Sequence, residues 1–202
     1  MTSQSLSQGL RGLRRTVAPT LRAVDLNSFK VHAGYEDDDQ DTLISEYIDA
    51  ATDYAEEYQN RCWRLSTWQA TYDSFPCDGV FYLPRPPLVA VSSIAYRDTA
   101  GDSQTFSASY YVVDAISEPG RIGLAIGYSW PPIGEMLNAV TVTYTAGYST
   151  VADIPARTRQ AIRMLASHWF EQREPIVIGT IVANVPLSVV DLLDADRLIS
   201  YR

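Results

Sequence analysis

The feature that most constrains the fold is a change of hydrophobic period along the chain. Between residues 39 and 60, large apolar side chains and alanines recur every three or four positions, which is the period of a helix. From about 63 to 149 the chain consists of short segments rich in Tyr, Val, Thr and Ser, interrupted by Pro and Gly, which is typical of strands. The helical period returns from 155 to 173. The sequence therefore predicts a β-rich insertion between two helical segments.

Two shorter helices complete the predicted helical part. Asp25 has the chemistry of a cap for a helix over 25–32, and Asp153 has the same position ahead of 155–173. A fourth helix is expected near the end of the chain. The predicted fold class is α+β, a small helical bundle with a β-rich insertion at about 63–149 and helices at about 25–32, 39–60, 155–173 and 189–200.

Inside the insertion, runs of β-branched and aromatic residues lie between Gly and Pro turns. The segment 83–87 carries three prolines and is expected to be an extended linker between strands, because the proline nitrogen cannot donate a hydrogen bond to a sheet. The predicted strands are 65–72, 80–83, 88–97, 110–114, 122–126 and 139–146.

The start of the chain has few large apolar groups, and this composition predicts a flexible arm over residues 1–20. Its arginines leave a second interpretation open, in which the arm becomes ordered against an acidic neighbour such as the 35–60 block of an adjacent subunit. The predicted organisation is an arm at 1–20, a helical core from 21–62 plus 150–175, an insertion at 63–149, and a tail with a short helix at 176–202.

Charge is distributed in blocks. The chain has a net charge of −8, residues 1–34 carry five basic side chains against one acid, and residues 35–60 carry ten acids and no base. Such blocks indicate surfaces that meet complementary partners, and the plainer alternative is a solvated helix face beside a loose tail. The net negative charge disfavours general binding of nucleic acid.

The motifs of the common catalytic and metal-binding classes are missing from the sequence. One lysine and no Gly-x-x-x-x-Gly-Lys exclude a P-loop, and neither Gly-x-Ser-x-Gly nor His-Glu-x-x-His occurs. The two cysteines, Cys62 and Cys77, and the two histidines, His32 and His168, lack the close paired spacing of the usual four-ligand zinc site. We therefore expect no enzyme activity, cofactor, metal or catalytic residue, and an enzyme built from scattered Asp, Tyr and Arg residues is the least favoured alternative.

Targeting signals are also missing. No apolar run reaches the roughly 20 residues of a membrane span, and the first residues lack the features of a signal peptide. The sequence therefore predicts synthesis in the cytoplasm and no membrane partner.

The aromatic residues leave one functional alternative open. Trp63, Trp68, Trp130 and nearby tyrosines could form a stacking platform, which would make the insertion a carbohydrate- or surface-binding module. The competing interpretation is that these rings fill a core and interfaces, and the helical or alternating positions of the tyrosines favour it.

Several motifs, taken in order, resemble those of one protein family. They are the acidic helix Glu36–Tyr58, Leu83-Pro84-Arg85-Pro86-Pro87-Leu88, Ile94-Ala95-Tyr96-Arg97-Asp98 with Gly101, Val142–Tyr148, Ile154-Pro155 followed by Ala161–Leu165, Trp169–Glu174, and Val185-Pro186 leading into Leu192-Leu193. From about residue 20 to 202 the chain resembles the head-tail connector, or head-completion adaptor, proteins of long-tailed bacteriophages and phage-derived gene transfer agents. Phe170 stands where relatives have tyrosine, which is a conservative departure.

The resemblance implies a structural role. It implies a homo-oligomeric ring, commonly twelvefold, that docks beneath the portal protein of a capsid and presents a platform to the next neck or stopper protein of the tail. DNA would pass through its channel without sequence-specific binding. The expected location is the neck of a virion or phage-like particle, with assembly in the bacterial cytoplasm.

Two sets of residues are candidates for these contacts. The family's C-terminal segment extends into the portal, so the portal-binding candidates are Val189, Leu192, Leu193, Leu198, Tyr201 and Arg202; a helix packed on its own subunit is the equal alternative. The inter-subunit candidates are Arg157, Arg159, Arg163, Asp37, Asp38, Asp39 and Asp41. The acids among them have two further readings of equal standing, lining the DNA channel or facing outward.

Overall fold

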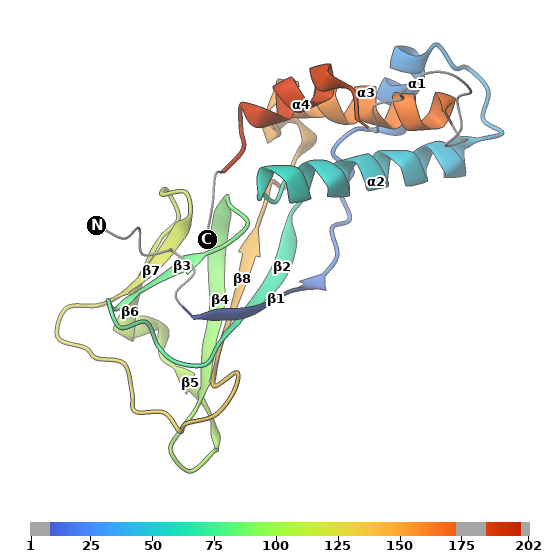
Figure 1. Cartoon of the computed structure of the whole chain (residues 1–202). Coiled ribbons are helices and arrows are strands. Elements are labelled where there is room, and N and C mark those ends of the chain that lie inside the picture. The colour runs from blue at the N-terminus through green and yellow to red at the C-terminus, as the bar shows by residue number, and fades with distance from the viewer. Residues whose placement is uncertain (1–8, 173–184, 199–202) are drawn as a thin grey trace. The chain divides into compact units, whose positions relative to one another are not determined.

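The computed structural model describes residues 9–172 and 185–198, which form two compact units. We call residues 20–64, 148–172 and 185–198 the helical unit, and residues 9–19 and 65–147 the sheet unit (Figure 1). The predicted α+β fold class is confirmed. The division leaves Trp63 in the helical unit, although the predicted insertion began with it.

The described residues of the helical unit form four helices, and each overlaps a predicted one, although the last ends at Asp194 and not at about residue 200. They are α1 (Leu26–Ala33), α2 (Asp41–Gln59), α3 (Ala156–Glu171) and α4 (Leu187–Asp194). Asp25 caps α1 as predicted, because its Oδ1 accepts a hydrogen bond from the Ser28 amide at 2.8 Å. The predicted Asp153 cap is wrong. Asp153 lies in a 3₁₀ helix (Val151–Asp153) and accepts a hydrogen bond from the Thr150 hydroxyl, while Pro155 occupies the N-cap of α3.

One apolar core joins the four helices. The buried positions on α2, α3 and α4 recur at helical spacing, so each of these helices presents one apolar stripe to the core, and α1 contributes Phe29. Phe170 lies where several aromatic rings meet, with ring centroids 6.1 Å from Phe29 and 5.6 Å from Tyr35. The core residues of the helices are Phe29, Ile44, Ile48, Ala51, Ala55, Ala161, Ile162, Leu165, Ala166, Phe170, Val189 and Leu193.

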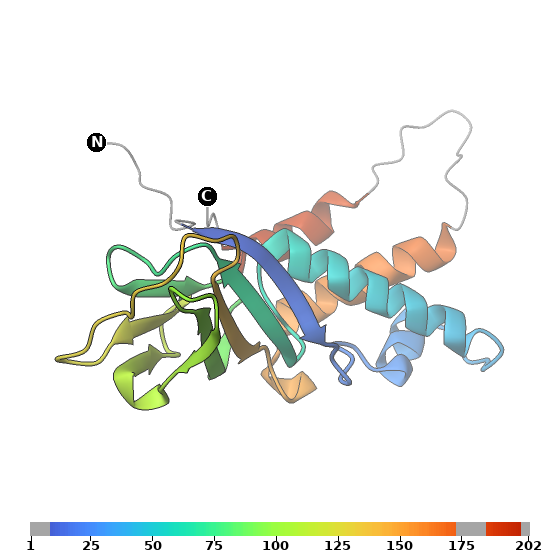
Figure 2. The ribbon, with the colours of Figure 1, turned by 90° about the horizontal axis from the view of Figure 1, so that it is seen from below.

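The sheet unit consists of two antiparallel sheets (Figure 2). The five-stranded sheet has the order β1-β2-β8-β4-β5 and the three-stranded sheet the order β3-β7-β6. The strands are β1 (Leu10–Val17), β2 (Ser66–Tyr72), β3 (Val80–Leu83), β4 (Leu88–Arg97), β5 (Ser103–Phe106), β6 (Tyr111–Asp114), β7 (Gly120–Leu124) and β8 (Val140–Ala146), with a 3₁₀ helix, Ala108–Tyr110, before β6.

Buried and half-buried side chains alternate strictly along β2 and β8, which gives the five-stranded sheet two different faces. Every second residue of each strand is buried, from Ser66 to Tyr72 and from Val140 to Ala146. The residues between them are half-buried and polar, namely Thr67, Gln69, Thr71, Thr141, Thr143 and Thr145. One face therefore belongs to the core of the unit, and the other is a face of hydroxyl and amide groups.

The predicted flexible arm over residues 1–20 is wrong for Leu10–Val17, which forms β1. This strand pairs antiparallel with β2, and Leu13 lies opposite Ala70 on the core face. The Arg15 guanidinium lies 4.8 Å from the centre of the Trp68 ring. The composition of β1 is only weakly apolar. The strand is ordered by these contacts and by backbone hydrogen bonds to β2, which is more than fifty residues away in the chain.

Gly120 provides a test of packing between the sheets. A Cβ at this position would lie 2.5 Å from both Cβ and Cδ2 of Leu88. We expect Gly120→Ala to destabilise the protein by about 1–3 kcal/mol through overpacking, measured by urea unfolding. Gly123→Ala in the same strand is the matched control, because a Cβ there meets nothing within 4 Å. Equal losses in the two variants would contradict the prediction.

Candidate assembly surfaces

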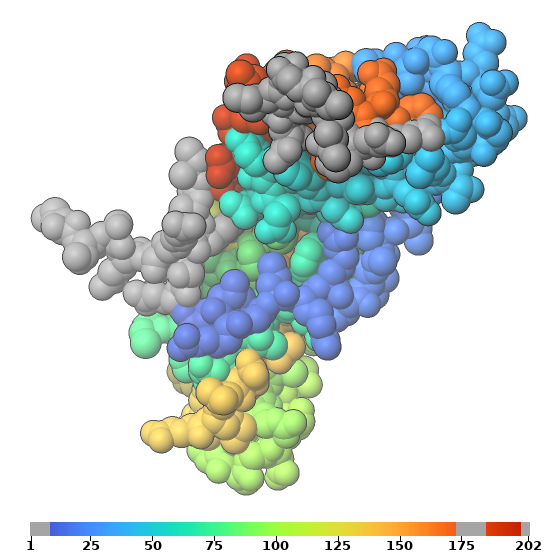
Figure 3. Space-filling view, turned by 45° about the vertical axis from the view of Figure 1, so that its right-hand side comes forward, coloured from blue at the N-terminus to red at the C-terminus, as the bar shows by residue number. Residues whose placement is uncertain are grey.

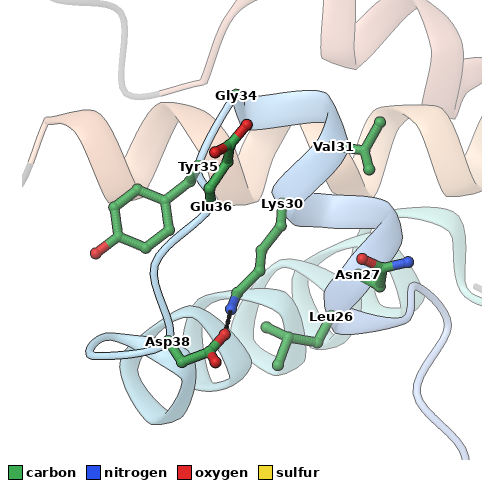
Figure 4. A pocket seen from close by; sticks show the side chains of 8 residues that line it. All are labelled: Leu26, Asn27, Lys30, Val31, Gly34, Tyr35, Glu36 and Asp38. Atoms are coloured by element: carbon green, nitrogen blue, oxygen red, sulfur yellow. Dashed lines mark hydrogen bonds and ion pairs between the residues drawn. The ribbon is translucent and has the colours of Figure 1, made fainter.

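A hollow of about 610 Å³ lies beside α1 and the loop that leads to α2. Its walls combine apolar and charged side chains, from Leu26, Asn27, Lys30, Val31, Gly34, Tyr35, Glu36 and Asp38 (Figure 4). Lys30 extends from α1 to the loop, and its Nζ lies 2.5 Å from Oδ1 of Asp38 and 2.5 Å from Oδ1 of Asp41. Hydrogen bonds to these two carboxylates raise the pKa of Lys30, and the same contact lowers the pKa of Asp38.

The four acids predicted at subunit contacts therefore differ in their surroundings. Asp38 and Asp41 are engaged by Lys30 within the subunit, and Asp39 accepts a hydrogen bond from the Tyr35 hydroxyl. Asp37 is exposed and makes no ion pair with any residue that the structure describes. Asp37 thus has the carboxylate most available to a neighbouring molecule among these four.

The three arginines of α3 that were predicted at subunit contacts also differ in their surroundings. Arg157 forms a two-point ion pair with Asp196 beyond α4, at 2.6 Å from Nε and 2.5 Å from Nη2, so it ties two parts of its own subunit together. Arg159 donates to the carbonyl of Ile154, and Arg163 donates to the side chain of Gln160. Within the described ranges neither Arg159 nor Arg163 contacts a carboxylate, and the Nε of Arg163 is buried without a hydrogen-bond partner.

The portal-binding candidates on α4 lie on two faces. Val189 and Leu193 are buried in the core of the helical unit, as the alternative interpretation expected, so they are not exposed for a partner. The Gln59 amide donates to the carbonyl of Leu193 at 2.8 Å, which joins α2 to α4. Leu192 and Leu198 are half-buried, and Tyr201 and Arg202 lie outside the described residues.

The three tryptophans proposed as a stacking platform do not form one. Trp63 is 1% exposed in the helical unit, where its Nε1 donates to Gln59 and its ring stacks on Tyr148. Trp68 is 8% exposed, and Trp130 stacks on Phe75 with ring centroids 4.7 Å apart. These rings are packing residues, which removes the main support for the carbohydrate-binding alternative.

An exposed aromatic pair was not predicted. Tyr110 and Tyr128 stack with centroids 4.5 Å apart, and the side chains of Val112 and Ile126 are also exposed. Local sequence offered no signal for it, because exposed and buried tyrosines have the same strand-like neighbours. Nearby, hydrogen bonds from Ser117 and Arg121 lower the pKa of Asp114, so a satisfied ion pair closes the turn between β6 and β7.

In the parts of the chain that the structure places, no helix is long and apolar enough to cross a membrane. Among the same residues, no group of three or more His, Cys, Asp or Glu side chains is arranged to hold a metal ion.

A comparison with protein families identifies the relationship. A model of the phage gp6-like head-tail connector protein family matches residues 23–118. The predicted relationship to the head-tail connector proteins is confirmed. The match spans α1, α2 and much of the sheet unit of this connector-like chain. No curated protein matches it at a significant level.

Solved structures extend the likeness to nearly the whole chain. One is from the neck of an empty gene transfer agent (GTA) particle computed with C6 symmetry, with a TM-score of 0.77, 20% identity, and coverage of 94% of this chain and 97% of the other. A chain from the virion of a native GTA particle has a TM-score of 0.76, 20% identity and the same coverage. A third chain, from the neck of a native GTA particle computed with C12 symmetry, has a TM-score of 0.73 and 19% identity, with the same coverage of both chains.

Proposed function

We propose that this chain is a structural neck adaptor, which forms a ring beneath the portal of a phage-like capsid and links the head to the tail. The observation that carries the proposal is the likeness over 94% of the chain to a neck component of a GTA particle. The family match over residues 23–118 supports the same role independently of the fold. Such a role requires assembly surfaces and neither a cofactor nor a catalytic group.

The ring is proposed to close through unlike surfaces of neighbouring subunits. A head-to-tail interface needs two different, complementary patches. Arg159 and Arg163 supply positive charge and have no carboxylate partner in the described residues. Asp37 supplies negative charge and has no basic partner among the same residues. The remaining candidates, Arg157, Asp38, Asp39 and Asp41, act by holding the shape of the subunit, because they have partners within it.

The C-terminal segment of the chain is proposed to contact the portal, and α4 is proposed to hold this segment in place. Val189 and Leu193 anchor α4 in the core, and Leu192, Leu198, Tyr201 and Arg202 are the proposed contacts. The opposite end of the ring would receive the next neck or stopper protein, and DNA would pass through the channel without sequence-specific contacts. The proposed location is the neck of a particle assembled in the bacterial cytoplasm.

Co-assembly with the portal protein of the same particle tests this function. Purified full-length chain and portal rings are mixed, and the complex is measured by sedimentation and by electron microscopy of negatively stained particles. We expect a ring of this chain on one end of the portal, and a marked loss of binding when residues 199–202 are deleted. Deletion of residues 1–8 is the control and is expected to leave binding unchanged. Absence of any complex with the full-length chain would contradict the proposed function.

A further inference from the structure

Two arginines, Arg11 and Arg14, lie on β1 at the edge of the five-stranded sheet. The Arg14 Nη2 donates to Oε1 of Gln69 at 2.8 Å, and the Arg11 Nε donates to Oδ2 of Asp73 at 2.6 Å. A bulge between Leu10 and Gly12 breaks the alternation of β1. Arg14 lies opposite Gln69 in the antiparallel pair, so its guanidinium is held on the polar face, and Arg11 lies at the bulge beside it. β1 itself is open to view in Figure 3.

Arg14 is held in place without being neutralised. The Gln69 side chain that accepts its hydrogen bond also donates to the Thr143 hydroxyl at 3.5 Å, so the amide is oriented by β8. An amide is neutral, and no carboxylate among the described residues contacts Arg14. Arg11 differs, because Asp73 compensates its charge while also accepting a hydrogen bond from the Asn138 amide. The structure therefore presents a fixed, uncompensated guanidinium on a face of hydroxyl groups.

The face of α2 that carries Glu46 has the opposite character. The helix contains six acidic residues and no basic one. Glu46, Asp53 and Glu57 are exposed and fall at spacings that place them on one side of the helix. Asp53 pairs with Arg64 at 2.5 Å, and Glu57 also has an interaction, whereas Glu46 makes none with the described residues. Acids four residues apart repel each other along this helix, which favours a cationic neighbour.

We propose that Arg14, with Arg11 beside it, binds the acidic face of α2 of a second copy of this chain, centred on Glu46. The inference rests on the proposed ring and names one of its contacts. The pair that carries the contact is Arg14 and Glu46, because neither has an oppositely charged partner among the described residues of its own subunit. The Arg14 guanidinium can thus face the Glu46 carboxylate with planar charge-assisted hydrogen bonds.

Charge reversal at each side tests the contact. Arg14→Glu and Glu46→Arg are prepared separately, and assembly of the full chain, by itself or on portal rings, is followed by sedimentation velocity. Each variant is expected to need a concentration about tenfold higher for half-assembly, with a smaller difference at high salt. Arg97→Glu is the matched control, because Arg97 is an exposed arginine of the same sheet that donates to the Gly101 carbonyl. Equal effects of Arg14→Glu and Arg97→Glu would overturn the inference.

Mixing the two variants separates a contact between copies from one within a copy. In an alternating ring of Arg14→Glu and Glu46→Arg subunits, every contact again joins opposite charges, so an equimolar mixture is expected to regain wild-type assembly. A mixture as weak as its components would overturn the inference. So would unchanged assembly of Arg14→Glu together with reduced retention of double-stranded DNA on a filter, which would assign Arg14 to phosphate binding. Failure of the wild type to form rings under any of these conditions would instead count against the proposed function.

Discussion

Replacing Glu56 with alanine is expected to destabilise the helical unit by about 3–5 kcal/mol, because it leaves a buried guanidinium without its main counter-charge. Glu56 is 3% exposed, and Arg64 beside it is 4% exposed. One Glu56 oxygen accepts hydrogen bonds from the amides of Trp63 and Arg64 at 3.0 and 3.1 Å, and the other accepts from Arg64 Nη2 at 3.2 Å. Burial opposes the charge of Arg64, yet the Glu56 and Asp53 carboxylates raise its pKa overall.

Urea unfolding followed by tryptophan fluorescence measures this loss. Glu46→Ala is the matched control, since Glu46 is an exposed acid of the same helix, and it is expected to change the free energy of unfolding by less than about 0.5 kcal/mol. A loss below about 1 kcal/mol for Glu56→Ala would show that the buried pair contributes little. Because a less stable helical unit leaves fewer folded subunits, the same variant is expected to lower the yield of assembled rings.

The second large effect is expected from Leu193→Ala, which should cost about 2–5 kcal/mol by leaving a cavity beneath α4. Leu193 is 1% exposed, and its carbonyl accepts the Gln59 side chain. The Tyr58 hydroxyl also donates to Asp194 at 2.7 Å, so α4 is held to α2 at two successive residues. Loss of packing at Leu193 therefore weakens the attachment of α4, the helix that precedes the proposed portal contacts.

Thermal unfolding of the isolated chain distinguishes this effect from a lost portal contact. We expect Leu193→Ala to lower the melting temperature before any portal is added, and Leu187→Ala, at a position that is 77% exposed on the same helix, to leave it unchanged. A normal melting temperature with weakened portal binding would contradict the packing role. That result would instead support Leu193 as a portal contact, as the sequence predicted.

Helix positions were predictable because an amphipathic helix repeats its apolar residues within a few turns. The stripe of α2 and the cap at Asp25 needed no knowledge of distant residues. The same local reasoning failed for β1, whose few apolar residues are separated by arginines and a bulge, and for β5, whose residues are mostly polar and exposed. It also failed at Asp153, because this residue has the chemistry of a cap but ends a 3₁₀ helix, and Pro155 occupies the N-cap of α3.

The candidate contacts were less predictable than the fold. Arg157, Arg159 and Arg163 looked equivalent in the sequence, yet Arg157 is bound by Asp196, thirty-nine residues away. Asp38 and Asp41 were likewise indistinguishable from Asp37 until Lys30 was placed between them. Whether a charge is available to another molecule depends on which opposite charge lies within about 4 Å of it, and that is a property of tertiary structure.

By itself the sequence determined the division into helical and β-rich parts, the four helices, and the relationship to the head-tail connector proteins. Hydrophobic period and turn residues are local signals, and the motifs of the family are read in chain order. Only the tertiary structure decided that Leu10–Val17 is a strand, that Trp63 is a packing residue, and which arginines keep an uncompensated charge. These outcomes depend on pairings between residues far apart in the chain, whose energies no local pattern encodes.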